Sequence, residues 1–173
     1  MKHPPAAALL PAVLAAGLLA ACAHLPQSSL TARLEPRSGS QASGTVKFSN
    51  TGDKTRIEAT VRGLTPGEHG FHIHEAGDCS APDASSAKGH FNPEGKPHGH
   101  HTYREYHAGD LPNLIADAEG NARYVAEVPR LDLGKGPKGI QDRAIVVHAD
   151  PDDYRSQPAG NSGKRVACGV IGS

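Results

Sequence analysis

Short segments in which apolar and polar side chains alternate, each ended by a turn, constrain the fold of this chain more than any other feature. In the clearest segment, Ile57, Ala59 and Val61 alternate with charged and hydroxyl side chains. A period of two places the apolar and polar side chains on opposite faces of a half-buried strand. Turn residues at 51–53 and 64–67 bound this segment. The same pattern predicts about eight strands, at 31–35, 45–49, 56–62, 71–73, 111–116, 122–128, 143–148 and 166–171.

The composition agrees with a turn-rich β protein. The chain has 20 Gly, 14 Pro, few aromatic residues and no Trp, and no useful helix-period segment follows residue 30. Strand spacing and turn density therefore predict an all-β fold, an antiparallel sandwich or barrel. We expect one domain over 31–173, without internal repeats. The 18 basic and 18 acidic side chains cancel, so nothing indicates a nucleic-acid partner.

The N-terminal segment is predicted to be an export signal rather than part of the fold. Lys2 precedes an apolar stretch over 6–21, which is too short and too interrupted for a comfortable membrane span. The stretch ends in Leu19-Ala20-Ala21-Cys22, which resembles the lipobox of bacterial lipoprotein signal peptides, where cleavage leaves a lipid on the cysteine. An ordinary secretory signal with an incidental cysteine is the alternative.

The lipobox predicts the organisation and location of the chain. We expect a signal peptide over 1–21, removed on export, a polar tether over 22–30, and a membrane anchor through a lipid on Cys22. The mature protein would be a cell-envelope lipoprotein on the periplasmic face of a membrane in a Gram-negative bacterium.

The cysteine count supports export. Three cysteines are an odd number, which calls for an explanation in a secreted protein. If Cys22 carries lipid, Cys79 and Cys168 remain as a pair, and disulfides persist outside the cytoplasm. A bridge over so long a loop would stabilise the fold by roughly 4–5 kcal/mol on the chain-entropy model. Two free thiols are the alternative.

The stretch 75–110 has no strand pattern and is too long for an ordinary connection. Loops of this length inside a compact domain are usually functional. This loop holds Cys79 and five of the chain's 11 histidines. A disulfide and a bound metal would supply the order that apolar burial does not.

Two histidines two residues apart are the first candidate metal ligands. In His72-Ile73-His74, a strand places both imidazoles on one face, while Phe71 and Ile73 face the core. We therefore expect both imidazoles to point outward, side by side. A third imidazole comes from His148, at the end of the strand 143–148, where loops converge.

The long loop adds a second group of ligands. His90, His98, His107 and Asp110 are three imidazoles and one carboxylate, a set that suits tetrahedral Zn²⁺. Such a set fills four positions, so the zinc site would be closed and structural. The imidazoles outside it suit copper better than an oxygen-preferring ion.

At these residues the sequence closely resembles the copper–zinc superoxide dismutases. The resemblance runs from about residue 31 to the end of the chain, with several motifs in the family's order. The matching segments are Gly70-Phe71-His72-Ile73-His74-Glu75, His90-Phe91-Asn92-Pro93, His107-Ala108-Gly109-Asp110-Leu111, Val146-Val147-His148, Gly160-Asn161 and Arg165-Val166-Ala167-Cys168-Gly169-Val170-Ile171.

The resemblance implies a role for each matching residue. Copper would be held by His72, His74, His90 and His148. Zinc would be held by His90, His98, His107 and Asp110, so that His90 bridges the two metals. Arg165 would guide and hold superoxide beside copper, Asp152 would link a ligand of each metal, and Cys79 and Cys168 match the family's disulfide.

The resemblance also implies the fold and the reaction. The fold would be an eight-stranded Greek-key β-barrel. The enzyme would convert two superoxide anions to dioxygen and hydrogen peroxide, with one copper and one zinc per subunit and with His90 passing a proton. It would protect the cell envelope from superoxide, as a monomer or a homodimer.

Some residues depart from the eukaryotic members of the family. Ala149 stands where many of them have Glu, and the loop between His148 and Arg165 is short. Both features resemble the bacterial, periplasmic branch, in which a lysine of the metal loop would attract superoxide. Lys88 is the candidate for this lysine.

Three further histidines have no role in that scheme. His100 and His101 would compete with His98 for zinc or would be plain loop residues, and the spacing favours His98. His69 is expected to make a structural hydrogen bond.

Three alternatives compete with a copper–zinc dismutase. A copper chaperone or metal-buffering lipoprotein on the same fold would have lost ligands or Arg165. A copper-only dismutase would lack His98, His107 and Asp110. An adhesive β-sandwich would carry surface histidines only.

Overall fold

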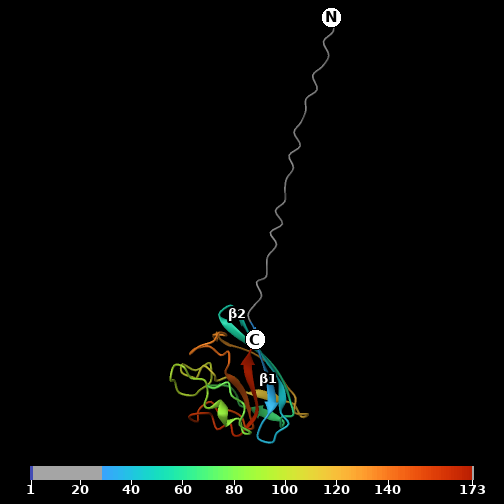
Figure 1. Ribbon diagram of the computed structural model, residues 1–173, viewed down its shortest axis with the longest axis vertical. Helices are drawn as coiled ribbons and strands as arrows, with labels where there is room; N and C mark the ends of the chain where they lie inside the picture. The colour runs from blue at the N-terminus through green and yellow to red at the C-terminus, as the bar shows by residue number, and fades with distance from the viewer. Residues whose placement is uncertain (2–28, 173) are drawn as a thin grey trace.

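The computed structural model describes Met1 and residues 29–172, and residues 29–172 form a single β-rich body (Figure 1). The expected signal peptide, the tether up to residue 28 and Cys22 lie outside the described residues. The described residues contain nine strands and one short 3-10 helix. These elements are β1 Ser29–Pro36, β2 Ser43–Thr51, β3 Lys54–Arg62, β4 Gly67–His69, β5 Phe71–His74, η1 Ser85–Ala87, β6 Leu114–Ala116, β7 Ala122–Pro129, β8 Ala144–His148 and β9 Arg165–Gly172.

The strands form a curled antiparallel sheet whose neighbours are often distant in sequence. Seven strands are hydrogen-bonded in the order β5-β8-β9-β1-β2-β3-β7, and β4 pairs with β6. Strand β1 therefore lies between β2 and β9, the last described strand. This arrangement confirms the expected all-β fold, an antiparallel Greek-key barrel. No helix of the described residues is long and apolar enough to cross a membrane.

The predicted strands differ from the observed ones at three places. Strand β1 begins at Ser29, and Leu30 is 5% exposed, so the last two residues assigned to the tether belong to the barrel. Strand β6 covers Leu114–Ala116 and is shorter than the predicted segment 111–116. Strand β4 was not predicted, and its first residue, Gly67, falls in the expected turn 64–67.

Alternation separates the core from the outer face as the sequence predicts. Phe48, Ile57 and Ile73 are fully buried.

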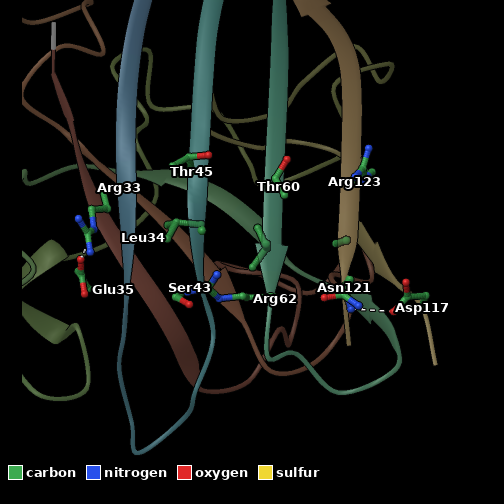
Figure 2. A pocket seen from close by; sticks show the side chains of 13 residues that line it. Arg33, Leu34, Glu35, Ser43, Thr45, Thr60, Arg62, Asp117, Asn121 and Arg123 are labelled. Carbon is green, nitrogen blue, oxygen red and sulfur yellow. Dashed lines mark hydrogen bonds and ion pairs between the residues drawn. The ribbon is translucent and has the colours of Figure 1, made fainter. Parts of the chain in front are cut away.

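On the outer face, a row of side chains crosses β1, β2, β3 and β7, and a groove of about 680 Å³ runs beside it (Figure 2). The paired residues of this row are Arg33, Thr45, Thr60 and Arg123.

The long loop 75–110 is fastened to the barrel at both ends. A disulfide joins Cys79 to Cys168 in β9, across 89 positions, which confirms the expected pair. Near its other end, the loop lies against β5, where the Ile73 N–H donates to the Gly109 carbonyl at 2.9 Å. Gly109 is required for this contact, because a Cβ there would collide with the Ile73 carbonyl oxygen. The loop therefore covers the outer face of β5.

Candidate metal centre

His72 and His74 point away from the barrel core, as the strand period predicts, but they are not exposed. Their residues are 0% and 1% accessible. The loop 75–110 covers them, and isolated backbone β-bridges pair His72 with Asp110 and His74 with His90. The expectation of outward-facing surface imidazoles is therefore wrong in one respect. The period sets the face of the strand, but a distant segment decides whether that face meets water.

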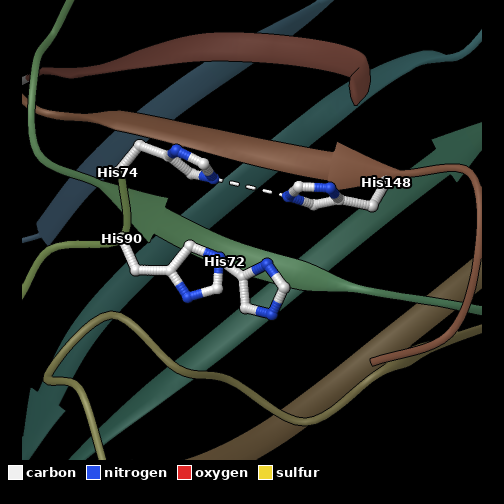
Figure 3. A group of neighbouring side chains, drawn as sticks. All are labelled: His72, His74, His90 and His148. Atoms are coloured by element: carbon white, nitrogen blue, oxygen red, sulfur yellow. Dashed lines mark hydrogen bonds between the residues drawn. The ribbon is translucent and has the colours of Figure 1, made fainter. Parts of the chain in front are cut away.

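Four histidines converge beneath the loop (Figure 3). His72 and His74 come from β5, His90 from the loop, and His148 from the end of β8. One ring nitrogen of each lies within 4.8 Å of the others. We call this group the imidazole cluster. It joins two neighbouring strands to the loop that closes over them.

Hydrogen bonds outside the imidazole cluster fix which ring nitrogen points inward. His72 Nε2 lies 2.7 Å from the Asp152 carboxylate, and His72 Nδ1 is buried without a partner. His74 Nδ1 lies 2.9 Å from the Lys88 carbonyl, and His148 Nδ1 lies 3.2 Å from the Ser162 hydroxyl. The inward nitrogens of His74 and His148 face each other at 3.4 Å. Neutral imidazoles in this arrangement direct lone pairs toward a common point.

A second group of side chains surrounds the Asp110 carboxylate. Its members are His90, His98, His107 and Asp110, all buried. We call it the mixed cluster. The Nδ1 atoms of His90, His98 and His107 lie 2.8, 3.0 and 3.3 Å from Asp110 oxygens. The Nδ1 atoms of His98 and His107 are buried and have no hydrogen-bond partner. Three imidazole nitrogens and one carboxylate oxygen are the type of ligand set that tetrahedral Zn²⁺ takes.

His90 belongs to both clusters. Its Nδ1 faces Asp110, and its Nε2 is buried and has no hydrogen-bond partner. The ring stacks on His72 with centroids 3.9 Å apart. One imidazole therefore offers a nitrogen to each group, which is the arrangement of a bridging ligand.

Burial favours the neutral form of the imidazoles that would bind a metal. It lowers the pKa of His74 and His148 well below the usual value. Burial and then the neighbouring His72 lower the pKa of His90 to about 4. In His98 burial also lowers the pKa, but the adjacent carboxylates of Asp110 and Asp152 outweigh it and raise the pKa to about 9. The imidazole cluster is thus uncharged at neutral pH, with lone pairs available.

Asp152 lies between the two clusters. One carboxylate oxygen is 2.7 Å from His72 Nε2 and the other is 2.9 Å from His98 Nε2. Asp152 as a whole is 3% exposed. Burial raises the pKa of its carboxyl group, but hydrogen bonds from both histidines outweigh this effect and hold the pKa below the usual range. Gly160 packs directly against this contact, because a Cβ there would collide with Asp152 and approach His98 Nε2 at 2.8 Å.

Arg165 is attached to the loop beside the imidazole cluster. Its guanidinium donates to the Ala84 carbonyl at 2.7 Å and to the Lys88 carbonyl at 2.6 Å. The Lys88 carbonyl also accepts from His74, so one oxygen positions both side chains. Lys88 itself is exposed, and its backbone has φ +62°, a conformation that favours glycine.

The remaining histidines differ in their contacts. His69 contacts the His148 and Thr65 carbonyls, both at 2.8 Å, which agrees with the expected structural role. His100 and His101 belong to neither cluster. His100 contacts the Thr102 hydroxyl at 2.8 Å.

Sequence reasoning missed Arg143, which precedes β8. Its guanidinium lies 3.8 Å from the centre of the Phe91 ring, next to His90. It also donates to the carbonyls of Glu75, Gly136, Pro137 and Gly139. No local pattern predicts such a contact, because the four acceptors are backbone groups of two different segments.

Comparisons with known proteins agree with this geometry. The family profile described as "Copper/zinc superoxide dismutase (SODC)" matches residues 42–171. "Superoxide dismutase [Cu-Zn] 2" of Aquifex aeolicus is 47% identical over 133 residues, which cover 74% of this chain and 78% of that protein. "Superoxide dismutase [Cu-Zn]" of Deinococcus radiodurans is 43% identical over 92% of this chain and 93% of its own. The crystal structure of the clock protein EA4 matches with a TM-score of 0.76 and 39% identity, over 84% of this chain and 94% of that one.

Proposed function

Because the chain belongs to the copper/zinc superoxide dismutase family, we propose that each of its two clusters holds one of the family's metals. The protein is a superoxide dismutase that uses copper and zinc to convert superoxide to dioxygen and hydrogen peroxide. In our assignment copper occupies the imidazole cluster, and zinc occupies the mixed cluster. His90 joins the two sites.

The observation that carries this assignment is the set of buried ring nitrogens without hydrogen-bond partners. His72 Nδ1 and His90 Nε2 face the imidazole cluster, whereas His98 Nδ1 and His107 Nδ1 face Asp110. Leaving a buried polar atom unpaired is costly, so several such atoms directed at two points indicate two ligands. Imidazoles alone suit copper, and three imidazoles with a carboxylate suit zinc. Copper, when bound, would supply the one-electron chemistry of the reaction.

The side chains around the imidazole cluster would bind and orient superoxide. Arg165 keeps its positive charge at any working pH and is held by two carbonyls beside His74. His90 Nε2 is the atom that would take and return a proton, because Nδ1 is turned toward Asp110. Lys88, exposed at the rim of the loop, would attract the anion. Asp152 would keep His72 and His98 in their tautomers and orientations.

Two substitutions test the division between the clusters. His72→Ala should abolish dismutation and leave the fold intact, because it removes a ligand of copper only. Asp110→Ala should mainly lower zinc content and thermal stability. Elemental analysis, a dismutation assay and circular dichroism would measure these effects. Equal loss of copper from both variants would contradict the assignment.

We also propose that the protein is a lipoprotein of the cell envelope, protecting it from superoxide. The support is the sequence Leu19-Ala20-Ala21-Cys22 and a polar stretch before β1. The disulfide between Cys79 and Cys168 fits an oxidising compartment.

A cysteine substitution tests the anchor. Cys22→Ala should release the protein from the membrane fraction without abolishing activity, since residue 22 precedes β1, the first strand of the described residues. Fractionation of cells followed by a dismutation assay would measure both properties. A variant that stays with the membrane would exclude lipid on Cys22 as the anchor.

A further inference from the structure

Ser162 is a buried serine that is not a proposed metal ligand but lies against one. It belongs to the loop between β8 and β9 and is 2% exposed. Its backbone carbonyl accepts from the Asp150 N–H at 3.0 Å, two residues beyond His148. Its side chain lies close to Gly70, because a Cβ at residue 70 would approach the Ser162 Cβ at 2.6 Å. Ser162 is therefore held in place beside the end of β8.

The hydroxyl of Ser162 has two partners, which together fix the direction of its single proton. The hydroxyl donates to the Ala159 carbonyl at 2.9 Å. His148 Nδ1 lies 3.2 Å from the same oxygen. A serine hydroxyl has one proton to donate and two lone pairs with which to accept. Because the Ala159 carbonyl takes the proton, the Ser162 oxygen accepts from His148, and His148 Nδ1 carries the hydrogen.

This tautomer leaves the lone pair of His148 on Nε2. His148 Nε2 faces the imidazole cluster and lies 3.4 Å from His74 Nε2 (Figure 3). The Lys88 carbonyl fixes His74 in the same tautomer, because a carbonyl oxygen can only accept from its Nδ1. The two inward nitrogens then direct lone pairs toward each other, and a cation between them would satisfy both.

A second acceptor near His148 Nδ1 lies farther away. The Gly163 carbonyl is 3.4 Å from this nitrogen, beyond the roughly 2.7–3.2 Å of ordinary N–H···O bonds, whereas the Ser162 oxygen lies within that range. The Ser162 hydroxyl is thus the nearer partner of this ring. Sequence reasoning missed it, because Ser162 stands 14 positions from His148 and belongs to no ligand motif.

We propose that Ser162 is a positioning residue for copper, because its hydroxyl fixes the tautomer and the ring orientation of His148. The proposal rests on the assignment of copper to the imidazole cluster. Outer hydrogen-bond partners of metal ligands typically change metal affinity by roughly 10- to 100-fold. Neither partner of the Ser162 hydroxyl belongs to the mixed cluster, so its effect should be confined to copper.

The metal affinities of two variants test this role. Ser162→Ala should weaken copper binding by roughly tenfold or more, measured by competition with a copper chelator, and should leave zinc binding unchanged. The electron paramagnetic resonance spectrum of bound Cu(II) should also change, because the His148 ring is less restrained. Asn161→Ala is the matched control, since it removes hydrogen bonds of the same loop to Asp153 and Ser156 but no partner of His148. It should bind copper as the unsubstituted enzyme does.

A measurement on the unsubstituted enzyme tests the tautomer itself. In the zinc-loaded enzyme without copper, ¹⁵N chemical shifts should show hydrogen on His148 Nδ1 and a bare Nε2. Hydrogen on His148 Nε2 would overturn the proposal, whatever the variants do.

The affinities can overturn the proposal in separable ways. Unchanged copper affinity in Ser162→Ala would remove the role, and equal weakening in Asn161→Ala would make the order of the loop the cause. A parallel loss of zinc from Ser162→Ala would indicate a general loosening of the fold instead of a lost contact to His148. Full copper content in His148→Ala would contradict the assignment of copper to the imidazole cluster, which is a failure of the proposed function and not of the role of Ser162.

Discussion

One backbone carbonyl and one side-chain carboxylate each hold two of the residues proposed to bind a metal or superoxide. The Lys88 carbonyl accepts from both His74 and Arg165, so a shift of this one atom would move a proposed copper ligand and the charge proposed to bind superoxide together. The Asp152 carboxylate likewise contacts a histidine of each cluster. At the scale of the residue, the two proposed metal sites and the proposed anion site are therefore coupled by shared acceptors, in addition to the shared imidazole of His90.

Gly160 offers a test of the Asp152 contact. A methyl group at residue 160 would displace Asp152 from His98, so Gly160→Ala should weaken zinc binding by roughly 10- to 100-fold, as loss of an outer partner does. Gly52→Ala is the control, because Gly52 has a similar φ of +62° but no neighbouring atom within 4 Å. Competition with a zinc chelator would measure both affinities. Equal weakening in the two variants would show that backbone strain, not displacement of Asp152, is the cause.

At the scale of the element, Arg143 fastens the metal loop to β8. Its guanidinium packs on Phe91 and donates to the Glu75 carbonyl at 2.7 Å. Phe91 follows His90 directly, so this packing also restrains the proposed bridging ligand. The attachment is formed by a side chain at the start of one strand and by backbone groups of the loop beside it.

Loss of Arg143 should loosen the loop while leaving the barrel. Arg143→Met should lower the free energy of unfolding by about 2–4 kcal/mol, because several charge-assisted hydrogen bonds disappear. Hydrogen exchange should rise in the loop more than in β1–β3. Arg123→Met, on the exposed face of β7, is the control and should change stability little. A uniform rise in exchange over the barrel would contradict a local role.

Local patterns predicted the elements better than the contacts between them. The alternation over 56–62 predicts β3 almost to its ends, since each side chain reports its own face. Strand β4 escaped prediction because three residues beside a turn are too few to show a period. The candidate ligands were predicted from local motifs and their resemblance to a family, whereas the burial of His72 and the contacts of Gly160 and Arg143 depend on segments far away in sequence.

At the scale of the whole molecule, the net charge is zero, so a superoxide anion gains nothing from the overall field. Attraction must come from local positive charge, and such focused fields weaken as salt screens them. Arg165 and Lys88 are the proposed sources beside the imidazole cluster.

The ionic-strength dependence of catalysis separates these two charges. Arg165→Ala should lower catalytic efficiency and weaken inhibition by small anions, because the same charge serves binding. Lys88→Ala should lower efficiency less and flatten its dependence on salt. Measurements of dismutation over a salt series would show both effects. An unchanged salt slope in Lys88→Ala would assign attraction to another cation, with Lys164 or Arg155 next in line.

The pairing of β1 with β9 places a limit on when the chain can fold. Residues 29–36 of β1 are translated early. One of the two strands that pair with β1, β9, is complete only when residue 172 has been made. Contacts between segments so far apart in sequence form slowly, because a long loop must close first. The ribosome therefore releases β1 together with its neighbour β2 but long before its other neighbour β9, and His148 and Arg165 also follow late. If the chain is exported as proposed, this late pairing would keep the barrel open, and the chain competent for translocation, until synthesis is almost finished.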